Sequence, residues 1–263
     1  MTKVGIPEDY VVPMEGAAPG VFGLRIAFVN VYGVADGDSS WTLVDAGLPF
    51  SASYIENWSE RTLRQPPKAI VLTHGHFDHV SAARVLGDKW DVPIYAHPLE
   101  FPYLTGERAY PAPDLSAGGG LMTWLSPLYP KGPVQIGDRL RPLPDEESDL
   151  LPGWAVTHTP GHTPGHISFF RPSDRTLIAG DAFCTTKPES FFEAAIAQAP
   201  ELHGPPAYFT MDWQQAARSI EKLAELEPAV IVPGHGKPLS GAGVPINLRR
   251  LAEGLQRDLH HAA

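Results

Sequence analysis

The residues with the clearest capacity for chemistry lie at 74–79, where the sequence is HGHFDH. Three imidazoles and one carboxylate fall within these six residues, directly after the apolar run 69–73, which predicts a β-strand. Histidine is the commonest metal ligand in proteins, and carboxylates complete many sites for zinc and similar ions. Helical spacing does not explain the pattern, because Gly75 is a poor helix former. A solvated polar loop is the alternative, but ligand-type side chains at this density favour a metal site.

Three later segments repeat this design, in which a short apolar run ends at a turn that carries a ligand-type residue. His162 lies within the turn TPGHTPGH, Asp181 ends the run LIAGD, and His235 follows the run VIVPG. Loops at the ends of strands on a rigid scaffold are where catalytic groups concentrate. The predicted metal ligands, which suffice for two ions, are His74, His76, Asp78, His79, His162, Asp181 and His235.

Together with the strand end LVDAG at 43–47, these motifs resemble the metallo-β-lactamase-fold hydrolase superfamily, and most closely its glyoxalase-II-like, dinuclear branch. The motifs match in order and in kind over about residues 20–240. The resemblance implies an α+β fold, namely the metallo-β-lactamase-like αββα four-layer sandwich of two mixed β-sheets flanked by helices. An expected order of strands followed by helices in two similar halves agrees with this architecture.

The resemblance also divides the ligands between two metal ions. His74, His76 and His162 would bind the first ion, Asp78, His79 and His235 would bind the second, and Asp181 would bridge them. Asp45 would orient a ligand histidine, as metal-bound imidazoles usually require, although a turn residue is the alternative for Asp45 alone. We expect His166, four residues after His162, to support the site through hydrogen bonds and not to bind metal.

This ligand set implies a metal-dependent hydrolase in which a hydroxide shared by two divalent ions attacks an acyl carbon. Asp78 and Asp181 are the expected catalytic carboxylates, and Asp78 is the candidate for relaying a proton to the leaving group. Nitrogen and oxygen ligands suit zinc, which is the expected ion, and they also accommodate iron or manganese. The predicted substrate is a small ester, lactone or thioester.

Narrower activities of the superfamily are disfavoured by particular features. β-Lactamases of this fold generally lack an acid at the position of Asp181 and are exported. Glyoxalase II binds glutathione with a helical C-terminal domain, for which the stretch after His235 is too short. Lactone-hydrolysing relatives commonly place a tyrosine shortly after the bridging acid, where this chain has the residues AFC. A phosphodiesterase of the nuclease branch would need an added domain or a basic surface, and neither is visible.

Two alternatives come from other functional classes. A mononuclear iron oxygenase acting on sulfur compounds uses a similar His-X-His motif within the superfamily, and it would hold one metal ion per chain. A non-enzymatic binding protein is the least favoured alternative, because degenerate members typically lose the ligands that are intact here.

The composition is that of a soluble globular chain, and the expected partner is a small-molecule substrate. Its 263 residues suit a single domain over 1–263, and 43% of them are hydrophobic, without a run that could span a membrane. A net charge of −10 with scattered basic residues argues against a nucleic-acid partner. The single cysteine, Cys184, and an N-terminal stretch without a signal-peptide core predict a cytoplasmic location.

The interval at about 106–151 is predicted to be an ordered insertion. It is rich in proline and glycine, but it also carries Tyr110, Trp124 and Tyr129, which a disordered linker would rarely contain. We expect it to form part of a lid over the site, and a contact in a homodimer is the alternative. Candidate residues of the substrate pocket, although such residues are more often core, are Phe183, His203 and Tyr208.

Overall fold

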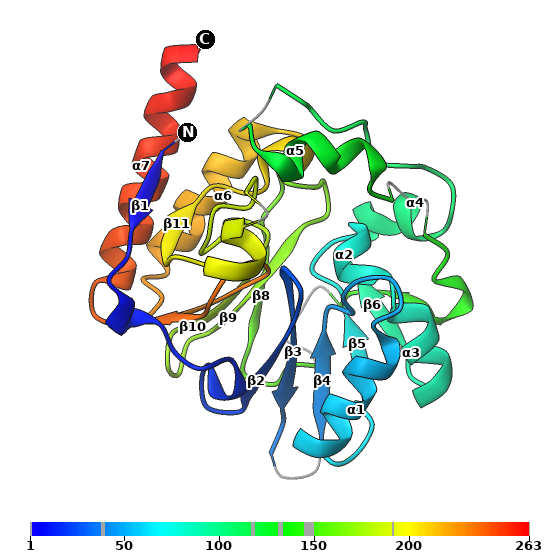
Figure 1. Cartoon of the computed structure of the whole chain (residues 1–263). Coiled ribbons are helices and arrows are strands. Elements are labelled where there is room, and N and C mark those ends of the chain that lie inside the picture. Colours follow the sequence, from blue (N-terminus) through cyan, green and yellow to red (C-terminus); the bar gives the residue numbers. More distant parts are fainter. Residues whose placement is uncertain are drawn as a thin grey trace.

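Two mixed β-sheets pack face to face between outer layers of helices, so the fold is the predicted αββα sandwich (Figure 1). The computed structural model describes residues 2–37, 40–116, 119–130, 134–144, 150–190 and 192–262. Among these residues, no helix is both long enough and apolar enough to cross a membrane.

The first sheet has an antiparallel half and a parallel half. Strands β2, β3 and β4 pair in antiparallel fashion, and β4, β5, β6 and β7 continue the sheet in parallel. The strands are β2 (Val21–Ile26), β3 (Val29–Ala35), β4 (Trp41–Val44), β5 (Ala69–Val71), β6 (Ile94–Ala96) and β7 (Leu140–Pro142). The parallel connections require helices, and these cover the outer face: α1 (Ala52–Thr62) and α3 (Ala83–Trp90).

The second sheet has the order β13-β12-β10-β9-β8, in which only β10 and β12 are parallel. Its strands are β8 (Ala155–His158), β9 (Ile167–Arg171), β10 (Thr176–Gly180), β12 (Val230–Pro233) and β13 (Leu239–Ser240). Its outer face is covered by α6 (Trp213–Glu225), which begins at the capping residue Asp212, and by α7 (Val244–Ala262). A separate pair of strands, β1 (Lys3–Gly5) and β11 (Glu201–His203), packs beside α7.

Short helices connect the strands at the edges of the sandwich. The α-helical ones are α2 (Phe77–Val80), α4 (Phe101–Leu104) and α5 (Leu121–Leu125). The remaining turns are η1 (Glu8–Tyr10), η2 (Met14–Gly16), η3 (Pro98–Glu100), η4 (Ser126–Leu128), η5 (Gly137–Arg139), η7 (Ala207–Phe209) and the π-helical turn η6 (Glu193–Ala197).

Alternating side chains of both sheets fill the space between them. Val44 and Val71 of the first sheet lie in one buried cluster with Phe169, Ile178 and Val232 of the second. Because β4, β5, β10 and β12 are all anchored by this cluster, the loops that follow these strands have rigid starting points. Six of the seven predicted metal ligands follow β5, β10 or β12, and the seventh, His162, lies in the loop between β8 and β9.

The interval 106–151 does not lie wholly outside the sandwich, because it contributes β7 to the edge of the first sheet. Another part of it packs against distant segments. The backbone N–H of Met122 donates to the carbonyl of Glu189 over 3.1 Å, and the ring of Tyr129 lies 5.4 Å from that of Phe77. Residues 117–118, 131–133 and 145–149 of the interval lie outside the described residues. Its role as a lid stays a prediction.

Candidate metal centre

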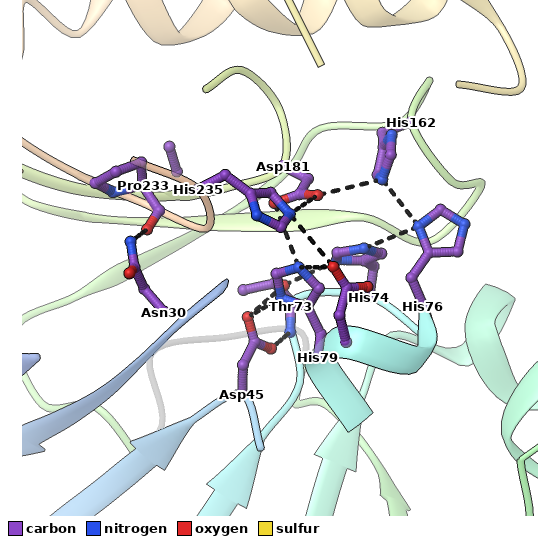
Figure 2. Close-up of polar contacts among 12 residues, drawn as sticks. Asn30, Asp45, Thr73, His74, His76, His79, His162, Asp181, Pro233 and His235 are labelled. Atoms are coloured by element: carbon purple, nitrogen blue, oxygen red, sulfur yellow. Dashed lines mark hydrogen bonds and ion pairs between the residues drawn. The ribbon is translucent and has the colours of Figure 1, made fainter. Parts of the chain in front are cut away.

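The predicted ligands converge at one end of the sandwich, where strands of both sheets stop (Figure 2). His74 and His76 lie in the loop after β5, and Asp78 and His79 lie on α2 directly after them. The other three residues come from the second sheet: His162 from the β8–β9 loop, Asp181 from the end of β10, and His235 from the end of β12.

Three imidazoles form the first group of inward-facing atoms. His76 Nδ1 lies 3.1 Å from His74 Nε2 and 2.9 Å from His162 Nε2. Burial lowers the pKa of His76 to about 3, and it also lowers the pKa values of His74 and His162 well below their usual range. All three side chains are therefore neutral near pH 7, which is the form of histidine that binds metals.

A second group contains Asp78, His79 and His235. The Nε2 atom of His235 lies 3.5 Å from Asp78 Oδ2, and that of His79 lies 3.9 Å from the same oxygen. Burial raises the pKa of Asp78. Burial opposes charge on His79 and His235, but the neighbouring carboxylates, Asp181 foremost, outweigh it and raise the pKa of both imidazoles.

The carboxylate of Asp181 lies between the two groups. Its Oδ2 is 3.0 Å from His235 Nε2 and 3.5 Å from His162 Nε2, while its Oδ1 is 3.4 Å from His79 Nε2. Burial opposes ionisation of Asp181, but the imidazoles of His235 and His79 lower its pKa well below the usual range. An ionised carboxylate therefore faces both sets of ligand nitrogens.

The cluster fits metal ions because two of its inner atoms are buried without a hydrogen-bond partner, whereas its outer atoms have such partners. His79 Nε2 and Asp181 Oδ1 are buried without a hydrogen-bond partner. On the outer side, His79 Nδ1 donates to Asp45 over 2.8 Å and His235 Nδ1 donates to the carbonyl of Phe28 over 2.7 Å. These bonds orient both rings so that their Nε2 atoms are directed inward. Three overlapping triads of ligand atoms, each within 4.8 Å, follow from this arrangement.

Asp45 occupies the orienting position that the resemblance implied (Figure 2). Its backbone has a φ of 61°, a left-handed conformation that aspartate tolerates better than most residues. Its carboxylate accepts hydrogen bonds from the backbone N–H of Thr73 at 2.8 Å, from Thr73 Oγ1 at 2.9 Å and from His79 Nδ1. Because Thr73 Oγ1 in turn lies 3.0 Å from His74 Nδ1, one carboxylate orients an imidazole of each ligand set.

His166 lies behind the carboxylate of Asp181 and not among the inward-facing ligand atoms. Its Nε2 accepts a hydrogen bond from the backbone N–H of Asp181 over 2.9 Å, and its Nδ1 lies 2.8 Å from Thr159 Oγ1. Burial lowers its pKa to about 4, so the ring is neutral and can accept. This contact fixes the backbone from which Asp181 projects.

Of the three predicted pocket residues, Tyr208 lines a cavity of about 200 Å³ beside His76. Phe183 is fully buried in the hydrophobic cluster under α6 and α7, so its assignment to the pocket is corrected to the core. His203 is also buried, with its Nε2 3.7 Å from Glu189 Oε2, and it does not line this cavity. Both residues follow the general tendency of large side chains near strand ends to pack inward.

The sequence interpretation missed Glu100, which connects the two loops of the first ligand set. This carboxylate is fully buried and accepts from the backbone N–H of Gly75 over 2.9 Å and of Gly165 over 2.6 Å. The hydroxyl of Tyr110 donates to it as well. Both glycines are needed, since a Cβ on Gly165 would lie 2.8 Å from the Glu100 side chain. The only local signal was an acid inside an otherwise apolar segment.

We expect Glu100→Gln to weaken metal binding by the first ligand set about 10- to 100-fold, as loss of an outer hydrogen-bonding partner typically does. The amide group of glutamine would turn an N–H toward at least one of the present donors, and the loop there would shift. Competition between the protein and a chromophoric chelator for Zn²⁺ measures the effect. Glu189→Gln is the control, because Glu189 is equally buried but accepts from the backbone of Ala207. Equal affinities for both variants would contradict this role of Glu100.

The family of the chain follows from comparison with known proteins. Residues 24–235 match the family model described as the metallo-β-lactamase superfamily, and the chain therefore belongs to this superfamily. Together with the buried ligand cluster, membership defines the chain as a metal-dependent hydrolase.

Two relatives from one organism are similar to this chain over most of their lengths. The chain is 45% identical over 244 residues to "Probable metallo-hydrolase YflN" of Bacillus subtilis strain 168, covering 91% of this chain and 92% of that protein. It is 30% identical over 221 residues to "Probable metallo-hydrolase YybB" of the same organism, covering 82% and 84%.

Similar solved structures share the fold over most of their lengths. The BLEG-1 B3 metallo-β-lactamase has a TM-score of 0.58 at 25% identity, with 84% of this chain and 92% of that chain covered. The protein TTHA1623, solved in a di-iron-bound form, has a TM-score of 0.56 at 28% identity, with 84% and 93% covered.

Proposed function

We propose that the chain is a dinuclear hydrolase of a small ester, lactone or thioester, within the glyoxalase-II-like branch. The observation that supports this proposal most directly is the position of Asp181, whose two oxygens face nitrogens of both ligand sets. The second set also argues against a one-ion oxygenase, because Asp78, His79 and His235 are buried with their ligand atoms within 4.8 Å of one another.

In this proposal His74, His76 and His162 would hold one ion, Asp78, His79 and His235 would hold the other, and Asp181 would serve both. When bound, two such ions polarise a carbonyl oxygen and lower the pKa of water toward about 7. Nitrogen and oxygen donors suit zinc, and they also accept iron or manganese. The di-iron form of TTHA1623 supports a pair of ions in this fold without deciding their identity here.

The chain's own residues supply orientation and proton transfer. Hydrolysis adds water to the acyl carbon, breaks the bond to the leaving oxygen or sulfur, and delivers a proton to that atom. Asp78 is the residue proposed to relay this proton, because its Oδ2 lies within the second set, 3.5 Å from His235 Nε2 and 3.9 Å from His79 Nε2. His166 and Asp45 keep Asp181 and His79 in place during the reaction.

The size of the substrate is limited by the surrounding segments. The cavity beside His76 has a volume of about 200 Å³ and lies between residues 110–114 and 208–211. This space suits part of a small molecule, and it supports a small-molecule substrate over a macromolecular one.

Metal analysis tests the proposal most directly. We expect about two equivalents of zinc or a comparable ion per purified chain, measured by mass spectrometry of the digested protein. The metal-loaded enzyme should turn over members of a panel of esters, lactones and thioesters, with phosphodiesters and β-lactams as comparison substrates. One retained iron with consumption of oxygen would instead indicate the oxygenase, and turnover of phosphodiesters alone would overturn the ester assignment.

A further inference from the structure

The cavity beside His76 has the size of a single ring. An engineered apolar cavity of about 150 Å³ is large enough to hold benzene, and the volume here is about 200 Å³. The cavity therefore has room for a six-membered ring or a short branched chain. His76 is its only lining residue from the predicted ligand set, among the residues that the structure describes, so a group in this space would lie next to the reacting bond.

Aromatic side chains form the walls of this cavity and are held by their neighbours. Tyr110 is buried. Its ring stacks on that of Tyr103 with 3.9 Å between the ring centroids, and its centroid lies 4.5 Å from that of the His76 ring. Phe209 lies 5.1 Å from the His76 ring and 4.8 Å from the ring of Tyr208. The backbone N–H of Asp114 donates to the carbonyl of Tyr208 over 2.9 Å, which ties the two walls together. An apolar ring would meet preformed aromatic surfaces here.

The charge at the rim of the cavity is negative. Asp114 is exposed, and its Oδ1 accepts from Ser116 Oγ at 2.6 Å and from the Ser116 backbone N–H at 2.9 Å. These hydrogen bonds from Ser116 lower the pKa of Asp114, so the carboxylate is ionised at neutral pH. None of the lining residues within the described part of the chain is a lysine or an arginine.

We infer that this cavity, defined by His76, Tyr110, Asp114, Tyr208, Phe209 and Met211, binds an uncharged, ring-sized apolar group of the substrate and selects against acidic groups. The inference rests on the proposed hydrolase function and specifies its substrate class. Esters or lactones of aromatic or branched aliphatic compounds fit it. Thioesters of glutathione, which carries two carboxylates, and anionic phosphodiesters do not, because Asp114 repels anionic groups at this rim and none of the described lining residues is a lysine or an arginine.

Two ester series and a binding measurement test the inference with metal-loaded enzyme. The first series varies the acyl group of 4-nitrophenyl esters and comprises the acetate, the phenylacetate and the hemisuccinate. The second series varies the alcohol and comprises the acetates of methanol, benzyl alcohol and glycolic acid. In at least one series, kcat/KM should be highest for the ester whose varied group is a ring, which is the phenylacetate in the first series and benzyl acetate in the second. It should be lowest for the acidic ester, which is the hemisuccinate or the acetate of glycolic acid. Calorimetry, which does not depend on turnover, should show that neutral phenylacetamide binds at least about fivefold more tightly than anionic succinamate.

Two substitutions in the cavity should each weaken the preference for the neutral ring-bearing ester, one by removing a wall and the other by reversing the charge at the rim. Phe209→Ala should lower kcat/KM for the preferred ring-bearing ester about tenfold, the lower end of the effect of one hydrophobic contact. Asp114→Lys should raise the ratio of acidic to neutral ester turnover at least about fivefold. Tyr54→Ala and Glu60→Lys on α1 are the matched controls, since both residues are exposed and lie outside the cavity. Glu60→Lys changes the net charge by the same amount as Asp114→Lys.

The outcomes separate this inference from the proposed function. Acidic esters that are turned over as well as neutral ones in both series would overturn the inference and leave the hydrolase assignment intact. A ring preference that Phe209→Ala does not reduce would overturn it as well. Failure to hydrolyse any ester while two metal ions are bound would overturn the proposed ester hydrolase, and the inference with it.

Discussion

Asp181→Ala is expected to abolish turnover and to lower metal occupancy. Among the residues that the structure describes, its carboxylate is the one group whose oxygens face nitrogens of both ligand sets, at 3.0 to 3.5 Å. Without it, the site would lose a carboxylate that faces both ligand sets, and with it the negative charge that would compensate bound cations. Since loss of an outer partner alone weakens metal binding about 10- to 100-fold, loss of this ligand should cost at least about 100-fold. Metal content after dialysis and kcat/KM at saturating zinc measure the two effects.

A control for this experiment exists at the opposite end of the same strand. Asp174 precedes β10 and pairs with Arg171 on the neighbouring strand, and Asp174→Ala removes this partly exposed ion pair together with a hydrogen bond of 3.2 Å from the backbone N–H of Thr176. It should cost about 1 kcal/mol of stability or less and leave metal content unchanged. Asp181→Asn, which preserves the volume of the side chain, guards against misfolding of the alanine variant. Full activity of either Asp181 variant would remove the bridging assignment.

Asp45→Asn should have the second largest effect, although Asp45 contacts no inward-facing ligand atom. Its two oxygens accept from Thr73 and His79, so an amide N–H would face a donor in either orientation. We expect about 1–3 kcal/mol lower stability of the protein and about 10- to 100-fold weaker binding of the metal held by His79. Denaturant unfolding and metal titration of the same preparations measure both quantities.

Asp212→Asn is the control for Asp45→Asn. It measures how much stability is lost when a hydrogen-bonded aspartate outside the site is replaced by asparagine. Asp212 caps α6 by accepting from the backbone N–H of Gln215 over 2.9 Å, outside the ligand cluster. Asparagine is also a good cap, so stability should change by only a few tenths of a kcal/mol and metal affinity not at all. If Asp45→Asn behaved like this control, the orienting role of Asp45 would be wrong.

The sequence allowed the fold and the candidate ligand residues to be predicted because the motifs that resemble the superfamily are short-range patterns. Apolar runs mark the strands, and each ligand lies within a few residues of the end of such a run. The strand predicted at 69–73 ends at Val71, which leaves Thr73 free to donate to Asp45. Polar residues after a buried strand are local information, and so the motif was visible without coordinates.

The connections between these segments could not be predicted in the same way. Glu100 and Gly165 are 65 positions apart, yet a hydrogen bond of 2.6 Å joins them. Phe183 was expected to be a candidate residue of the substrate pocket, but it turns inward beneath α6 and α7. The direction of a side chain near a strand end depends on what packs against it, which only the tertiary structure decides.

By itself, the sequence determined which side chains can bind metal, since ligand chemistry belongs to the residue type and strand ends are encoded locally. The tertiary structure decided how these side chains are held and what can approach them. The hydrogen bonds of Glu100 and Asp45, the contact of β7 with β6, and the cavity between Tyr110 and Phe209 all join distant parts of the chain. Such contacts form only when both sheets have packed, because their geometry depends on the whole core.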